Sequence, residues 1–163
     1  MKRLLDSIAN IAVIVASVVL LVYLGSSWYA SRNSPRPPDA RALIGSTIHL
    51  PGVNLALGSK TLLIAISPNC RYCRESEPFY RQLAKIPGLQ THLIAVVPVP
   101  LAEGKSYVNS SIDSSLEVVS DPLSEIHVQN TPTLLLVDGQ GRVKNAWIGK
   151  LDDAGQRSVQ SEL

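Results

Sequence analysis

The most apolar part of the chain lies near its N-terminus. Residues 7–31 hold no charged side chain, and residues 8–24 are mostly aliphatic. A helix that crosses the hydrocarbon core of a bilayer needs about 20 mostly apolar residues. We therefore expect a short N-terminal tail over residues 1–6 and one transmembrane helix, acting as a signal-anchor, over residues 7–29.

A cleaved signal peptide is the alternative interpretation of this segment, because small residues at 25–27 could form a cleavage site. The apolar run is longer than the usual apolar region of such peptides, about 7 to 15 residues, which favours retention. Basic residues flank the run on both sides: Lys2, Arg3, Arg32, Arg36 and Arg41. The positive-inside rule therefore does not decide the orientation.

A proline-rich stretch follows the apolar run. Residues 31–40 read SRNSPRPPDA and show no apolar periodicity. Closely spaced prolines favour extended backbone, which makes a semi-rigid spacer. We predict a linker over residues 30–42 and a folded domain over residues 43–163.

Strand-like and helix-like patterns alternate at the start of this domain. Residues 61–67, TLLIAIS, form a nearly continuous apolar run, typical of a strand covered on both faces. From Cys70 to about residue 86, Phe79, Leu83 and Ile86 recur at helical spacing. Residues 91–99 form a second apolar run, so the three segments predict two parallel strands joined by a right-handed helical crossover.

The C-terminal part predicts an antiparallel arrangement. Residues 115–120 are a weaker third strand, and residues 133–138 and 142–149 are two strand-like runs joined by the turn at 139–141, which contains two glycines. Such a turn favours a hairpin. Residues 152–163 predict a last short helix, capped by Asp152 or Asp153. The fold class is therefore α/β, a mixed sheet with helices packed on it.

Length and charge narrow the picture further. A chain of 163 residues with 45% hydrophobic residues suits one folded domain with a membrane appendage. The formal net charge of +2 is spread along the chain and forms no basic stripe. Nucleic-acid binders concentrate positive charge, so we expect no nucleic-acid partner.

The chain contains only two cysteines, Cys70 and Cys73, and three interpretations of this pair compete. A structural disulfide would close a very short loop and would therefore add little stability. A metal site would need further ligands, and the histidines at 49, 92 and 127 do not form the second close pair that structural zinc motifs use.

Redox exchange is the third interpretation, and the placement of the pair favours it. Cys70 lies where an apolar strand ends and a helix begins, so unpaired backbone N–H groups and the helix dipole would stabilise its thiolate. Cys73 lies one helical turn further and would be more buried. It could therefore resolve a mixed disulfide formed on Cys70.

The order of these features resembles the thioredoxin-like fold. The strand TLLIAIS, the motif PNCRYCRESEP and the distant segment NTPTLLLVDGQGRVKNAWIG are similar, within that fold, to membrane-anchored thiol–disulfide oxidoreductases of the TlpA/ResA type. The resemblance covers roughly residues 43–163. It implies a thioredoxin-like mixed sheet, with Cys70 as the attacking and Cys73 as the resolving cysteine.

The same resemblance implies a substrate-binding loop at Thr131 and Pro132, with a cis proline and with the backbone of Thr131 holding an extended client chain. It also implies a reductant for cytochrome c or other cofactor-protein maturation, acting on protein thiols and disulfides and served by a membrane-bound electron donor. We expect no cofactor and no metal. The expected location is the bacterial inner membrane, single-pass, with the catalytic domain in the periplasm.

The sequence departs from this family pattern at three places. Asn69 stands where many relatives have tryptophan, and Ser76 stands where some have an acid. The strand TLLIAI holds no counterpart of the buried aspartate of thioredoxin. Proton transfer to the resolving cysteine must therefore rely on water or on another group.

Other functions stay open at this point. A copper-delivery protein of the Sco kind would use Cys70, Cys73 and His127, although its cysteines are one residue further apart. His127 could instead be a partly exposed histidine at a helix end. A docking module with an incidental cysteine pair is a third possibility. A peroxiredoxin-like peroxidase is disfavoured, because Leu63 and Ser67 stand where that family has proline and threonine.

Overall fold

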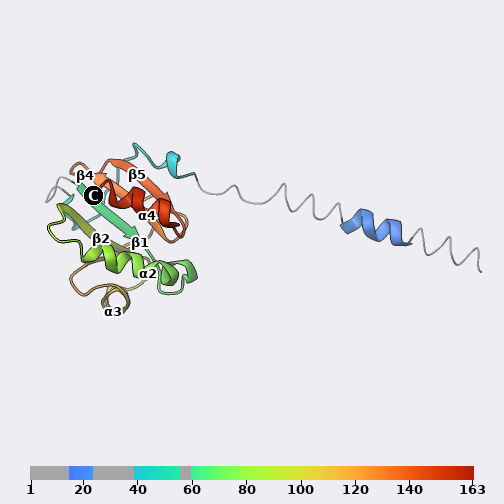
Figure 1. Cartoon of the computed structure of the whole chain (residues 1–163), viewed down its shortest axis with the longest axis horizontal. Coiled ribbons are helices and arrows are strands. Elements are labelled where there is room, and N and C mark those ends of the chain that lie inside the picture. Colours follow the sequence, from blue (N-terminus) through green and yellow to red (C-terminus); the bar gives the residue numbers. More distant parts are fainter. Residues whose placement is uncertain (1–14, 24–38, 56–59) are drawn as a thin grey trace, which may run out of the picture. The chain divides into compact units, whose positions relative to one another are not determined.

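The computed structural model describes residues 15–23, 39–55 and 60–163 (Figure 1). Residues 15–23 are helical. Within these described ranges, no helix is both long and apolar enough to cross a bilayer. The N-terminal tail, most of the predicted anchor and most of the linker lie outside the described residues, so those boundaries stay predictions.

The domain is built on one five-stranded mixed sheet with the order β3-β2-β1-β4-β5. Its strands are β1 (Lys60–Ala65), β2 (Thr91–Val97), β3 (Glu117–Ser120), β4 (Thr133–Asp138) and β5 (Val143–Ile148). Strand β1 pairs in parallel with β2 and antiparallel with β4. Strands β2 and β3 are parallel, whereas β4 and β5 form the predicted hairpin. The predicted mixed α/β sheet is therefore confirmed.

Strand β1 is the central strand of this sheet, and its last four side chains are all aliphatic. Leu62, Leu63, Ile64 and Ala65 have no exposed surface. A strand can bury both faces only when elements cover the sheet on both sides. One face packs against the helices, whereas the other packs against the irregular segments around residues 48–55 and 126–128.

The helices within residues 39–163 that the structure describes are η1 (Ala40–Ala42, a 3-10 turn), α2 (Arg71–Ala84), α3 (Leu101–Ser111) and α4 (Asp153–Gln160). Helices α2 and α4 lie over the same side of the sheet in Figure 1. The predicted helix after the cysteine pair is confirmed and ends at Ala84, slightly before the expected residue 86. The predicted C-terminal helix is also confirmed, with Asp152 as its N-cap.

Helix α3 was missing from the sequence prediction. Its only buried residues are Gly104 and Val108, so it shows no clear apolar periodicity. Pro100 occupies the N-cap and makes no side-chain cap bond, so the usual start signal is also absent. The helix provides the crossover that the parallel pairing of β2 and β3 requires.

Candidate active site

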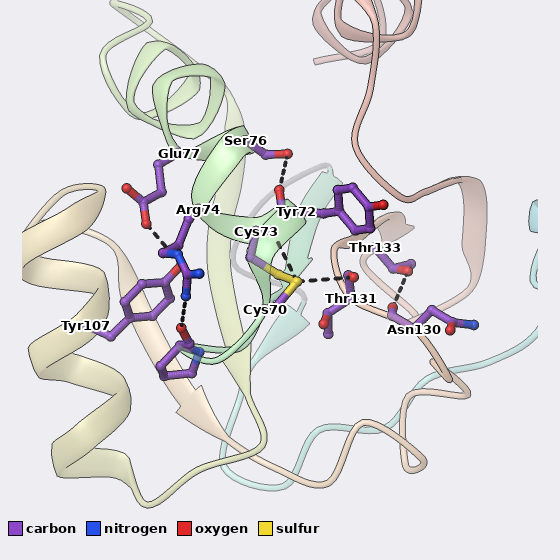
Figure 2. Close-up of a disulfide and its surroundings, with 11 residues drawn as sticks. Cys70, Tyr72, Cys73, Arg74, Ser76, Glu77, Tyr107, Asn130, Thr131 and Thr133 are labelled. Atoms are coloured by element: carbon purple, nitrogen blue, oxygen red, sulfur yellow. Dashed lines mark hydrogen bonds between the residues drawn. A yellow bond between two sulfur atoms is a disulfide. The ribbon is translucent and has the colours of Figure 1, made fainter.

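The two cysteines form a disulfide at the start of helix α2 (Figure 2). Cys70 is the N-cap residue, and its extended backbone (φ −90°, ψ 116°) turns the chain from the loop after β1 into the helix. The backbone N–H of Cys73 donates to Sγ of Cys70 at 3.1 Å. A sulfur at this position therefore lies at the N-terminal end of a helix, where backbone N–H groups and the helix dipole favour negative charge.

The two sulfurs differ in burial. Cys73 has no exposed surface and belongs to the core cluster between the sheet and its helices. Cys70 is half-buried and packs at the edge of the same cluster. A partner molecule can therefore reach Cys70 before it can reach Cys73, as the sequence predicted. The roles of attacking and resolving cysteine stay predictions.

The loop before strand β4 faces the disulfide. Sγ of Cys70 lies 3.3 Å from the carbonyl oxygen of Thr131, and the peptide bond between Thr131 and Pro132 is cis. The sheet register explains this contact, because Ala65, at the end of β1, pairs with Thr133, at the start of β4. The segment after β1 and the segment before β4 must therefore meet at one edge of the sheet.

Two hydrogen bonds fix this loop. The hydroxyl of Thr133 donates to the carbonyl of Asn130 at 2.7 Å (Figure 2). The backbone N–H of Gly149, just after β5, donates to the carbonyl of Pro132 at 2.7 Å. Pro132 is buried and Thr131 is half-buried. The backbone of Thr131 is thus held beside the disulfide.

A small charge network borders the site. The carboxylate of Glu75 accepts a hydrogen bond from Arg71 at 2.8 Å and another from Lys150 at 2.9 Å. Both bonds lower the pKa of Glu75, and the bond from Lys150 has the larger effect. The bond to Glu75 raises the pKa of Arg71. The i,i+4 spacing of Arg71 and Glu75 could have indicated the first pair. No sequence pattern indicates the second, because Lys150 is 75 positions away.

The departures from the family pattern have structural counterparts. Ser76 is buried, and its hydroxyl donates to the carbonyl of Tyr72 at 2.8 Å. Tyr72, between the cysteines, has a 56% exposed side chain, and Asn69 is also exposed. The side chains at 62–66, in and just after strand β1, are all aliphatic. No acid therefore stands at the positions of the family pattern, although Glu75 and Glu77 follow closely.

His127 does not join the cysteine pair. It lies in a turn with a positive φ of 58°, rather than at a helix end, and it is exposed. Across the described residues, no three His, Cys, Asp or Glu side chains are close enough together to hold a metal ion. His49 is exposed, and His92 pairs with Glu117 at 3.1 Å. The three residues of the alternative hypothesis, Cys70, Cys73 and His127, therefore do not form a copper site in this structure.

Comparisons with known proteins identify the fold. No protein-family profile matches the sequence, and no curated protein is significantly similar to it. The thioredoxin domain of a thiol–disulfide oxidoreductase from Bacteroides vulgatus is similar in structure, with a TM-score of 0.56 and 17% identity over 73% of this chain and 96% of that chain. A thiol–disulfide isomerase from Corynebacterium glutamicum has a TM-score of 0.56 and 18% identity over 81% and 97% of the two chains.

A third similar structure is the exposed lipoprotein thioredoxin Etrx1 of Streptococcus pneumoniae, with a TM-score of 0.53 and 24% identity over 65% of this chain and 86% of that chain. The chain therefore has a thioredoxin-like fold. Its structural neighbours are thiol–disulfide oxidoreductases and thioredoxins. The fold expected from the sequence motifs is thereby confirmed for the domain.

Proposed function

We propose that the protein is a thiol–disulfide oxidoreductase that exchanges electrons with protein clients through Cys70 and Cys73. One observation supports this most strongly. A disulfide with one accessible and one buried sulfur begins a helix and lies 3.3 Å from the carbonyl of Thr131, in a loop able to hold a client chain. A disulfide that only stabilised the fold would gain little from so short a loop.

The chemistry follows from the difference between the two sulfurs. In the reduced protein, the thiolate of Cys70 attacks one sulfur of a client disulfide, and the other client sulfur leaves as a thiolate that takes up a proton. The sulfur of Cys73, once deprotonated, then attacks Cys70 and releases the second client thiol. The client gains two electrons and two protons, and the protein is left with the disulfide between Cys70 and Cys73.

We further propose that the protein works as a reductant, tethered to the bacterial inner membrane by residues 7–29 with its domain in the periplasm. The apolar N-terminal run and the resemblance to TlpA/ResA-type proteins support this. Clients would be cytochrome c or other cofactor proteins during maturation. Each cycle would then need a membrane-bound electron donor, because the disulfide must be reduced again before another client is served.

A trapping experiment tests the exchange itself. In a Cys73→Ser variant, a client attacked by Cys70 cannot be released and should remain attached through a mixed disulfide, visible as a heavier band on a non-reducing gel. A Cys70→Ser variant is the matched control and should trap no client. Absence of adducts from both variants, together with tight stoichiometric Cu(I) binding by the wild type, would contradict the proposal in favour of metal delivery.

A further inference from the structure

Glu75 links helix α2 to the turn after β5. Within α2 it pairs with Arg71, the residue directly after Cys70. Across to that turn it pairs with Lys150, the residue directly after Gly149, whose N–H donates to the carbonyl of Pro132. One carboxylate therefore bridges the helix that begins at Cys70 and the turn that supports the cis-proline loop.

The bridge also partly balances the local charge. Arg71 and Lys150 contribute two positive charges, and Glu75 contributes one negative charge. Neighbouring charged groups on α2 make other contacts, since Arg74 donates to the carbonyl of Pro68 and Glu77 binds Arg81 and Tyr107. Glu75 is therefore the carboxylate that offsets Arg71 and Lys150.

This charge acts differently on the two redox states. The disulfide is uncharged, whereas the reduced protein carries a thiolate at Cys70 whenever that thiol ionises. Nearby positive charge stabilises a thiolate and so favours the reduced form, which makes a disulfide more oxidising. A carboxylate that neutralises this positive charge has the opposite effect and favours a reductant.

We propose that Glu75 is a positioning residue that lowers the reduction potential of the cysteine pair by offsetting the charges of Arg71 and Lys150. This inference rests on the proposed redox function. It names Glu75 as one side chain that makes the protein a better reductant.

The expected effect is small, because the side chains of Arg71, Glu75 and Lys150 are 79%, 32% and 49% exposed. Water and salt weaken interactions between such charges. We expect Glu75→Gln to shift the equilibrium with glutathione about threefold towards the dithiol, which corresponds to about 14 mV at 29.6 mV per tenfold change. Lys150→Gln should shift the equilibrium about as far towards the disulfide.

The double variant separates charge from structure. Both single substitutions break the bond between Glu75 and Lys150, but they change the local net charge in opposite directions. The double variant Glu75→Gln/Lys150→Gln keeps that bond broken and restores the wild-type net charge of Arg71, Glu75 and Lys150. It should therefore return close to the wild-type equilibrium. If the bridge acted only as a mechanical clamp, all three variants would shift in one direction.

The measurement uses the purified full chain, equilibrated with defined mixtures of reduced and oxidised glutathione, then alkylated and weighed by mass spectrometry. Glu117→Gln is the matched control, because Glu117 lies in the outer strand β3, which β2 separates from β1, and pairs with His92 rather than with Arg71 or Lys150. High salt should reduce the shifts of both single variants. The role of Glu75 would be overturned if the two single variants kept the wild-type potential, or if both shifted it in the same direction. A wild type that never interconverts with glutathione would instead overturn the proposed function.

Discussion

The Sγ atom of Cys70 lies 3.3 Å from the carbonyl oxygen of Thr131, although 61 positions separate the two residues in the chain. The antiparallel pairing of β1 with β4 allows this contact, because Ala65 pairs with Thr133, Cys70 follows Ala65 by five positions, and Thr131 precedes Thr133 by two. A client chain bound along the backbone of Thr131 would pass directly over the accessible sulfur. The fold thus brings the accessible sulfur next to the loop that we propose as the client-binding site.

The different burial of the two sulfurs predicts selective alkylation. After reduction, a brief pulse of iodoacetamide should label Cys70 roughly tenfold or more faster than Cys73, because Cys70 is accessible and its thiolate is favoured at the helix start. Peptide mass spectrometry gives both rates. In denaturing urea the two rates should become similar, and equal labelling of the folded protein would contradict this description of the site.

Asp152 predicts a measurable contribution to stability. Its carboxylate accepts the N–H of Gly155 at 2.8 Å and so caps helix α4. Replacing such a cap by alanine costs about 1 kcal/mol. Asp152→Ala should therefore lower the free energy of unfolding by about 1 kcal/mol in urea titrations. Asp153→Ala is the matched control and should cost a few tenths, because Asp153 lies in the first turn without capping it.

The sequence predicted those parts of the fold that depend on local patterns. Strand β1 and helix α2 were predictable, because one is continuously apolar and the other shows helical periodicity. Helix α3 was not, since it buries few side chains. For the N-cap of α4, the sequence offered two neighbouring aspartates, and only the structure shows that Asp152 is the cap.

The site divides in the same way. The positions of Cys70 and Cys73 followed from the junction between a strand and a helix. Thr131 and Pro132 entered only through the family resemblance, because only about 5 to 6% of X–Pro bonds in folded proteins are cis. Lys150 could not be predicted at all, since its contact with Glu75 depends on how β5 and α2 are placed in three dimensions.

Gly104 predicts the cost of overfilling the space between α3 and the sheet. A Cβ at this position would collide with the side chain of Val97 and contact Val118. Overpacking costs about 1 to 3 kcal/mol, and the better helix propensity of alanine returns about 1 kcal/mol. Gly104→Ala should therefore destabilise the protein by up to about 2 kcal/mol in urea titrations.

Two further variants check that explanation. Ser106→Ala, on the exposed face of the same helix, should leave stability nearly unchanged. In a Val97→Ala background, the cost of Gly104→Ala should shrink, because the colliding methyl group is gone. An equal cost in both backgrounds would show that the contact with Val97 is not responsible.

Buried Tyr80 and half-buried Tyr107 predict a loss of stability in strong base. Burial raises the pKa of Tyr80 to about 12, against a smaller opposing effect of a hydrogen bond with Ser76. Burial also raises the pKa of Tyr107, and the nearby carboxylate of Glu77 adds to the effect. Between pH 10 and the raised values, the folded protein keeps protons that the unfolded chain has already released. The free energy of unfolding therefore falls as the pH rises through this range.

Tyr80→Phe should remove part of that fall. In the oxidised wild type, the contribution of Tyr80 to the free energy of unfolding should be constant below pH 10. It should then decline by on the order of 2 kcal/mol as the pH approaches 12. The variant lacks the titrating phenol, so its free energy of unfolding should decline less steeply, whatever its stability at pH 8. Urea titrations of both proteins at intervals from pH 8 to the highest pH at which they remain folded would compare the slopes. Parallel curves above pH 10 would show that the Tyr80 phenol does not resist ionisation in the fold.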